Sequence, residues 1–397
     1  MERLYEKSQR LIQNQKINFV RYLFDSVNWS ERAIMISGSR EVGKTTLLLQ
    51  YLKMNPEISQ NSIYLSLDDI YFFENKLLDF ADIFYKNGGK LLVLDEVHKY
   101  SDWSIEVKNI LDSYPDLKII LTGSSALELF RGFGDLSRRV VRYNLHGLSF
   151  REYLELNNEL KISKISIEDI ISGQDEFVNE INSQIKILPE FNNYLKYGYY
   201  PYFIESIESF HQKLLNTINI ILEVDIPSSE SVNLKSINKL KKLFYVVASS
   251  VPFKPNITKI SENLDVSRTT TMHYLDILSK SQIIQMLATE KSGLSKLTKP
   301  DKIYLNDTNQ AYAFAENNVD IGNLRETFFL NQTLVVAKVF HTDKTDFCIN
   351  NKYYLEVGGK NKGFSQISGL KNSYIAADNL EYYAAGKIPL WLFGFLY

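Results

Sequence analysis

Residues 38–45 read GSREVGKT, a glycine-rich loop of the form GxxxxGK[ST], and this stretch decides how the N-terminal part of the chain folds. In such a loop the glycines let backbone N–H groups turn toward a phosphate, while the lysine reaches phosphate oxygens and the hydroxyl binds Mg²⁺. The loop therefore predicts a site for ATP and Mg²⁺. The residues expected to contact the nucleotide are Gly38, Ser39, Arg40, Glu41, Val42, Gly43, Lys44, Thr45 and Thr46.

The segments on both sides of the loop support this interpretation. Residues 33–37 (AIMIS) form a short apolar run that is typical of a buried parallel strand, and residues 45–51 (TTLLLQY) suit a helix. The loop is therefore expected to join a strand to a helix. The partial positive charge at the N-terminus of that helix would face the phosphates.

A second motif follows about fifty residues later. Residues 90–97 (KLLVLDEV) predict a buried strand that ends in two carboxylates. We expect Asp95 to bind the magnesium ion with Thr45, and Glu96 to orient and polarise the attacking water. The alternative is a strand that ends in two solvated acids. The phosphate loop favours the catalytic interpretation, because the two motifs need each other chemically.

A third apolar run offers a contact to the terminal phosphate. Residues 118–125 (KIILTGSS) predict a buried strand with small polar residues at its end. Thr122 and Ser124 can reach a γ-phosphate, and Ser124 is the preferred candidate. An ordinary turn after a strand is the alternative.

Residues 135–143 (DLSRRVVRY) supply three arginines. A guanidinium is well suited to stabilise the charge that spreads over a transferring phosphoryl group. Arg139 is the candidate arginine finger, and Arg138 and Arg142 flank it. The sequence leaves open whether Arg139 acts in its own subunit or in a neighbour's, which would require a homo-oligomer. An ordinary surface arginine is the alternative.

Several longer strings, in their order and spacing, resemble the prokaryotic AAA+ type ATPases whose C-terminal half is a separately named domain of unknown function. These strings are GSREVGKTTLL (38–48), LVLDEVHKYSDW (92–103), KIILTGSSALEL (118–129), RRVVRYNLHGLSFREYL (138–154), YLKYGYYPYF (194–203), DKIYLNDTNQA (301–311), LEVGGKNKGFSQI (355–367) and PLWLFGFLY (389–397). The resemblance implies an α/β fold with four parts. They are a P-loop ATPase core at residues 1–150, a helical lid at 151–230, a winged helix at 231–312 and a nuclease-like α/β domain at 313–397.

The segment assigned to the winged helix is basic. Between Lys235 and Lys299 eleven Lys or Arg residues stand against four acidic residues, a net charge of +7 in a chain whose total is −2. Such an excess is typical of contact with a phosphate backbone, and a solvated lysine-rich surface is the alternative.

Within this basic segment, residues 256–264 and 267–279 predict two helices joined by a short turn. Short polar and basic groups on the second helix are candidates for DNA contacts. They are Arg268, Thr269, Thr270, His273 and Lys280. Docking of a protein partner, or a rigid joint between domains, is the alternative role for such a module.

The last part of the chain resembles the ordered elements of PD-(D/E)XK nucleases through Glu326, Asp346, Glu356 and Lys360. In an active nuclease of this kind the acids bind a divalent metal, and a lysine two residues after the Glu positions water. That position is Gly358 here. Lys360 would share its face only if the strand continued through the paired glycines, which favour a bend. The expectation is a nuclease-like fold without cleavage activity.

The composition constrains the core, the disulfide bonding and the cellular location that we expect for this chain. The hydrophobic content of 45% in 397 residues is enough for several cores. Cys348 is the only cysteine, so no intrachain disulfide can form and a buried core position is expected. The N-terminus lacks a secretion-signal pattern and no apolar run reaches the roughly 18 residues of a membrane span. A cytoplasmic protein without membrane contact is expected.

The motifs together predict an ATPase that hydrolyses Mg·ATP and couples its nucleotide state to a partner-binding C-terminal region. The partner is DNA or another protein. The alternative is a switch or scaffold that binds nucleotide without hydrolysing it. A metal-dependent nuclease is the third function class.

Overall fold

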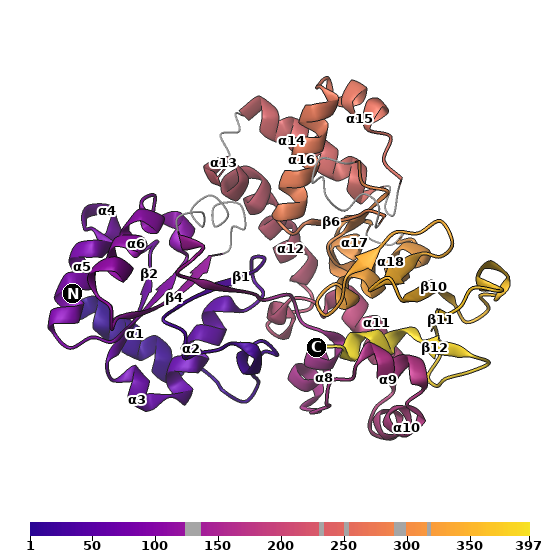
Figure 1. The fold of residues 1–397 in the computed structure, drawn as a ribbon, viewed down its shortest axis with the longest axis horizontal. Coiled ribbons are helices and arrows are strands. Elements are labelled where there is room, and N and C mark those ends of the chain that lie inside the picture. The colour runs from indigo at the N-terminus through magenta and orange to yellow at the C-terminus, as the bar shows by residue number, and fades with distance from the viewer. Residues whose placement is uncertain (124–135, 230–233, 250–253, 290–298, 316–318) are drawn as a thin grey trace. The chain divides into compact units, whose positions relative to one another are not determined.

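A computed structural model describes residues 1–123, 136–229, 234–249, 254–289, 299–315 and 319–397, which divide into two compact units (Figure 1). The first unit comprises Met1–Gly147 together with Asp225–Ser231, and the second comprises Leu148–Val224 with Val232–Tyr397. The chain therefore leaves the first unit after Gly147 and returns to it for one short segment that begins at Asp225.

The first unit is built on a five-stranded parallel sheet with the strand order β2-β3-β4-β1-β5. Every residue of β1 and β3 is buried, as is usual for parallel strands with both faces covered. The strands predicted from the three apolar runs are confirmed. These are β1 (Ala33–Ser37), β3 (Leu91–Asp95) and β4 (Lys118–Gly123). The sheet also contains β2 (Ser62–Ser66) and β5 (Val141–Asn144).

Helices complete the first unit and enclose a core that contains the fully buried Trp103. They are α1 (Glu2–Asn14), α2 (Lys44–Met54), α3 (Pro56–Ser59), α4 (Tyr71–Glu74), α5 (Leu77–Lys86), α6 (Trp103–Ser113) and, in the returning segment, α13 (Ile226–Ser229). The unit is thus an α/β fold in which α2 begins directly after the phosphate loop, as predicted.

The second unit begins with helices. They are α8 (Phe150–Asn158), α9 (Ile167–Ser172), α10 (Asp175–Gln184), α11 (Ile187–Tyr197) and α12 (Phe210–Ile220). Ser149 and Glu152 form a capping box that starts α8. A π-helical turn, Ile221–Asp225, follows α12 and leads the chain back into the first unit.

The basic segment folds as α14 (Leu234–Ala248), α15 (Ile257–Leu264), α16 (Arg268–Lys280) and an antiparallel pair of strands, β6 (Ile284–Leu287) and β7 (Lys302–Leu305). Asn256 caps α15 and Ser267 caps α16 through side-chain hydrogen bonds to backbone N–H groups. Asp265 takes a left-handed conformation between the two helices, with φ of 50°. The predicted pair of helices with a short turn is therefore confirmed.

The C-terminal part contains α17 (Thr308–Ala315), α18 (Ile321–Thr333) and a five-stranded mixed sheet in the order β12-β11-β10-β9-β8. The strands are β8 (Val339–Phe340), β9 (Phe347–Ile349), β10 (Tyr353–Gly359), β11 (Ser373–Asp378) and β12 (Lys387–Pro389). The parallel pairs β10–β11 and β11–β12 adjoin antiparallel pairs on the other side of β10.

Two sequence expectations concern this sheet. Cys348 is buried in β9, as expected for a core residue. The expected bend at the paired glycines is wrong, because β10 continues through Gly358 and Gly359 in register with β11. Within the described residues, no helix combines the length and the apolar character needed to cross a membrane.

Candidate nucleotide-binding site

The phosphate loop connects β1 to α2 at the carboxyl edge of the first unit's sheet. Gly38 must lack a side chain, because a Cβ there would lie 2.2 Å from the backbone oxygen of Leu145. Gly43 has a left-handed φ of 94° at the N-cap of α2, where glycine carries no steric cost. Both glycines of the motif are thus required by the path of the loop, which presents the N-terminus of α2 to a bound anion.

Lys44 is buried inside this loop. Its Nζ donates hydrogen bonds to the carbonyl oxygens of Gly38 at 3.0 Å and Ser39 at 2.6 Å. Burial lowers the pKa of Lys44 to about 8, with nearby Glu96 and Asp95 opposing the shift. The Ser39 hydroxyl is also buried, and it has no hydrogen-bond partner among the described residues. The loop therefore holds a cation and an unsatisfied polar group, both features that a phosphate would complement.

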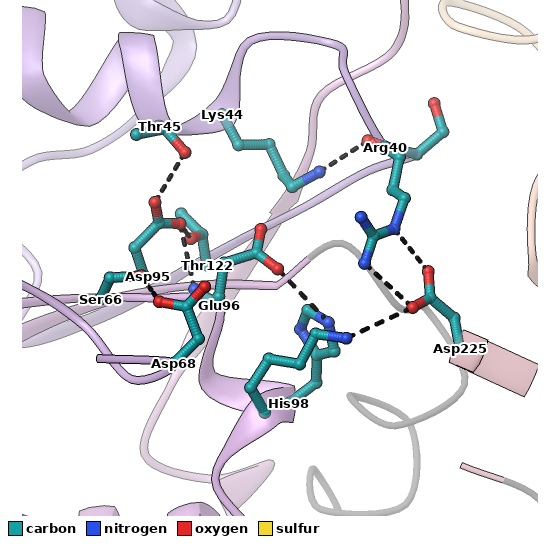
Figure 2. A network of polar contacts seen from close by, with 12 residues as sticks. Arg40, Lys44, Thr45, Ser66, Asp68, Asp95, Glu96, His98, Thr122 and Asp225 are labelled. Carbon is teal, nitrogen blue, oxygen red and sulfur yellow. Dashed lines mark hydrogen bonds and ion pairs between the residues drawn. The ribbon is translucent and has the colours of Figure 1, made fainter. Parts of the chain in front are cut away.

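Asp95 ends β3 and gathers hydrogen-bond donors from neighbouring elements (Figure 2). Its Oδ2 accepts hydrogen bonds from Thr45 Oγ1 at 2.6 Å and from Tyr64 Oη at 2.7 Å. Its Oδ1 accepts from the Thr122 hydroxyl and from the Glu96 N–H. The predicted pair Thr45 and Asp95 therefore lies in direct contact, with Thr122 of β4 beside it.

Glu96 follows with a left-handed φ of 53°, which turns its side chain away from the line of β3. Its Oε2 lies 3.4 Å from Nε2 of His98 (Figure 2). Burial lowers the pKa of His98 to about 3, so the imidazole is neutral at pH 7. His98 is therefore a buried neutral residue that contacts Glu96.

Arg40 in the loop is paired with Asp225, the first residue of the returning segment (Figure 2). Arg40 Nε lies 2.6 Å from Asp225 Oδ2, and Arg40 Nη2 lies 3.0 Å from Oδ1. Lys99 Nζ approaches the same carboxylate at 3.6 Å. Asp225 is 2% exposed, so this two-pronged contact is largely shielded from solvent.

The remaining catalytic candidates have different outcomes. Ser124 lies outside the described residues. Arg139 forms an exposed pair with Asp112 at 3.0 Å, and it precedes the start of β5, at the sheet edge opposite the phosphate loop. Arg139 therefore cannot serve the loop of its own subunit, and a role in a neighbour's site stays a prediction. Arg142 lies nearer the loop, since its Nε donates to Ser37 Oγ at 3.2 Å.

The DNA-contact candidates lie on α16 in the second unit. Arg268, Thr269 and His273 are exposed, and Thr270 is half-buried, with its N–H capped by Ser267. Lys280 is paired with Asp276 of the same helix at 2.7 Å. The N-terminal end of α16 is thus open to solvent, whereas the positive charge of Lys280 is offset locally.

The nuclease-like candidates are brought together only in part. Glu326 of α18, Asp346 before β9 and Glu356 of β10 share a cluster with Lys302 and Lys362. Lys360 is exposed beyond the end of β10, and its carbonyl accepts a hydrogen bond from Lys387. Lys360 is therefore not part of the cluster, and the prediction that placed Lys360 in the nuclease-like site is wrong.

The sequence interpretation missed Tyr64, Lys99, Asp225, Lys302 and Lys362. Tyr64 lies between Ile63 and Leu65 in β2, so its hydroxyl was a signal of a buried hydrogen-bond partner. Lys99 and Lys362 lie close in sequence to Glu96 and Glu356, whereas Asp225 and Lys302 lie in distant segments. No local pattern distinguishes any of the four from surface residues.

Comparison with known proteins finds a family match over most of the first unit and a second match in the second unit. Residues 30–154 match a family model described as an AAA domain, and residues 188–319 match a domain of unknown function. An uncharacterized protein of Methanocaldococcus jannaschii is 28% identical over 289 residues, which cover 70% of this chain and 61% of that protein. The match thus spans less than two thirds of the relative's own length.

Solved structures with a similar fold have low sequence identity. The Walker-type ATPase PABY2304 of Pyrococcus abyssi is 12% identical with a TM-score of 0.40, over 78% of this chain and 95% of that one. AMPPCP-bound DnaA from Aquifex aeolicus is 17% identical with a TM-score of 0.29, over 70% of this chain and 89% of that one. Residues 30–154 therefore match an AAA domain, and their strand–loop–helix on a five-stranded parallel sheet has the fold of a P-loop NTPase.

Proposed function

We propose that the first unit binds Mg·ATP and hydrolyses it, and that the nucleotide state is passed to the C-terminal part of the chain. The observation that carries this proposal is the direct contact of Thr45 with Asp95, which joins the phosphate loop to the end of β3. Lys44 lies within the loop and Glu96 follows Asp95, so the groups needed for phosphate binding and for water activation are adjacent.

The residues around Thr45 fit a magnesium ion. A hydroxyl and a carboxylate are the oxygen donors that Mg²⁺ prefers, and Thr45 and Asp95 already place theirs 2.6 Å apart. Tyr64 and Thr122 hold the Asp95 carboxylate in its orientation. When bound, the ion would neutralise charge on the β- and γ-phosphates.

The roles of the charged side chains follow from their surroundings. Lys44 would bind phosphate oxygens in place of the loop carbonyls that it now contacts. Glu96 would orient the attacking water and accept its proton, and the neutral His98 lies beside it at 3.4 Å. ATP turnover by the purified chain, with a Lys44→Met variant as the blank, tests the proposal. Turnover no higher than the blank would leave the non-hydrolysing switch as the function.

Arg40 and Asp225 offer a route for coupling. Arg40 lies in the loop that would contact the phosphates, yet its guanidinium is held by Asp225, the first residue of the returning segment. A phosphate oxygen and the Asp225 carboxylate would compete for the same guanidinium. Binding of ATP is therefore proposed to weaken the hold on the returning segment, which is continuous in sequence with the second unit.

An Asp225→Asn variant is expected to bind a non-hydrolysable ATP analogue about threefold or more tightly, because Arg40 no longer has a competing carboxylate. Isothermal titration calorimetry measures this affinity. The gain should vanish in an Arg40→Ala background, and Asp112→Asn, which removes the exposed partner of Arg139, should change nothing. An equal gain with and without Arg40 would refute the proposed competition.

Binding of DNA by α16 is the second part of the functional proposal, supported by the exposed basic and polar groups at its N-terminal end. Arg268→Ala is expected to weaken duplex DNA binding and to lower the salt dependence of binding by about one phosphate contact. Lys280→Ala should have a smaller effect, because Lys280 is already paired with Asp276. Fluorescence anisotropy across a salt series tests this. Unchanged binding by Arg268→Ala would leave a protein as the partner.

A further inference from the structure

Three carboxylates and two lysines form one cluster in the second unit. Two of the carboxylates come from α18 and β10, the elements labelled in Figure 1. Lys302 Nζ lies 3.1 Å from Glu326 Oε2 and 3.5 Å from Asp346 Oδ1. One ammonium group therefore bridges two acids that lie far apart in the sequence. All three of these side chains are less than a fifth exposed.

Lys362 supplies the second ammonium group. Its Nζ lies 2.5 Å from Glu356 Oε1, and the Glu356 side chain is 1% exposed. The stem of Lys362 passes over Gly358, where an added Cβ would lie 2.9 to 3.0 Å from three of its carbon atoms. The absence of a side chain at Gly358 thus gives Lys362 its path to Glu356.

Backbone and hydroxyl groups satisfy further oxygens of the cluster. Asp346 Oδ2 accepts from the Val357 N–H at 3.0 Å, and Glu356 Oε2 accepts from the Asp346 N–H at 3.3 Å. Tyr304 Oη donates to Glu326 Oε2 at 2.8 Å. The acids are therefore oriented by the protein and point toward its own donors, rather than toward a common empty centre.

This arrangement does not fit a divalent metal. Two ammonium charges already offset two of the three carboxylates, and a cation would have to displace a lysine from a largely buried position. No group of three or more Asp, Glu, His or Cys residues within the described ranges has an arrangement that could hold a metal ion. Burial raises the pKa of Glu326 and of Glu356, so their charge depends on a nearby counter-ion.

We propose that Lys302 and Lys362 are built-in counter-ions that occupy the place of a divalent cation, so that this domain folds without metal and does not cleave nucleic acid. Loss of the Lys302 charge would then expose Glu326 and Asp346 to solvent cations. Carboxylate oxygens are ligands that Mn²⁺ and Mg²⁺ prefer. The proposal stands independently of the ATPase function.

The test compares thermal unfolding of the full chain in MnCl₂ and in EDTA. In MnCl₂ the Tm of the wild-type chain should shift by no more than the Tm of Asp346→Asn. A shift that both proteins share reports Mn²⁺ binding at other sites. Lys302→Met keeps the apolar stem of the side chain, and its Tm should be about 3 °C or more higher in MnCl₂ than in EDTA. That gain should disappear in the double variant Lys302→Met/Asp346→Asn. Lys360→Met is the matched control, since Lys360 is an exposed lysine outside the cluster.

Three results would overturn the proposal. The first is a Mn²⁺-dependent rise in the Tm of the wild-type chain that Asp346→Asn abolishes. The second is DNA cleavage that Glu356→Ala abolishes. The third is the absence of any Mn²⁺-dependent rise in the Tm of Lys302→Met. Should Lys302→Met fail to fold, Lys362→Met tests the same proposal at Glu356. Its Tm should rise in MnCl₂, and the rise should disappear in the double variant Lys362→Met/Glu356→Gln.

Discussion

A Glu96→Gln variant is expected to lose at least about a hundredfold in ATP turnover while it still binds ATP. Glu96 is the carboxylate that follows Asp95, and it is the group proposed to take a proton from the attacking water. Glutamine keeps the size and the oxygen of the side chain but cannot take a proton from water. The loss should therefore fall on turnover, and the affinity for a non-hydrolysable analogue should change little.

Asp102→Asn is the matched control for this variant. Asp102 is an exposed acid outside the phosphate loop, so its substitution removes the same charge without removing a proton acceptor next to β3. Equal losses of turnover in the two variants would show that charge alone matters, and the assignment of Glu96 as the base would be wrong. Wild-type turnover at the level of the Lys44→Met blank would instead favour the nucleotide switch.

The parts of the site that could be predicted are contiguous in sequence. The GSREVGKT loop needs glycine at 38 and 43 for reasons of backbone geometry, so the motif itself reports the local conformation. The run KLLVLDEV likewise places Asp95 at the end of a strand. Because the carboxyl ends of parallel strands share one edge of the sheet, Thr45 and Asp95 had to lie close together.

The parts that could not be predicted depend on tertiary contacts between distant segments. Asp225 reaches Arg40 across 185 residues of sequence, and Lys302 bridges two acids that follow it by 24 and 44 positions. A lysine or aspartate in a polar segment has the same local appearance whether it is solvated or paired. For Arg139 likewise, its sequence context next to β5 did not reveal which edge of the sheet it occupies, so the question of whose subunit it could serve stayed open.

The prediction for Lys44 concerns both its charge and its burial. Lys44→Met is expected to lower ATP affinity by about a hundredfold or more, because a buried ammonium that contacts phosphate is lost. Burial lowers the pKa of Lys44 to about 8, and triphosphate binding would raise it again. Wild-type affinity should therefore fall as the pH rises above 8, where free Lys44 loses its proton, whereas the affinity of Lys44→Met should stay flat. Calorimetric titration between pH 7 and about 10 measures both.

Protein stability provides an independent check of the same pKa. Keeping Lys44 charged at pH 7 costs the folded state roughly 3 kcal/mol relative to an exposed lysine. Its folded pKa lies below the unfolded value, so the cost is fully present below pH 8 and is relieved as the pH rises toward that unfolded value. Between those limits the wild-type chain should gain stability relative to Lys44→Met in urea unfolding. A constant difference across this range would mean that Lys44 titrates like a solvated lysine, and the pH dependence expected for ATP binding would be lost with it.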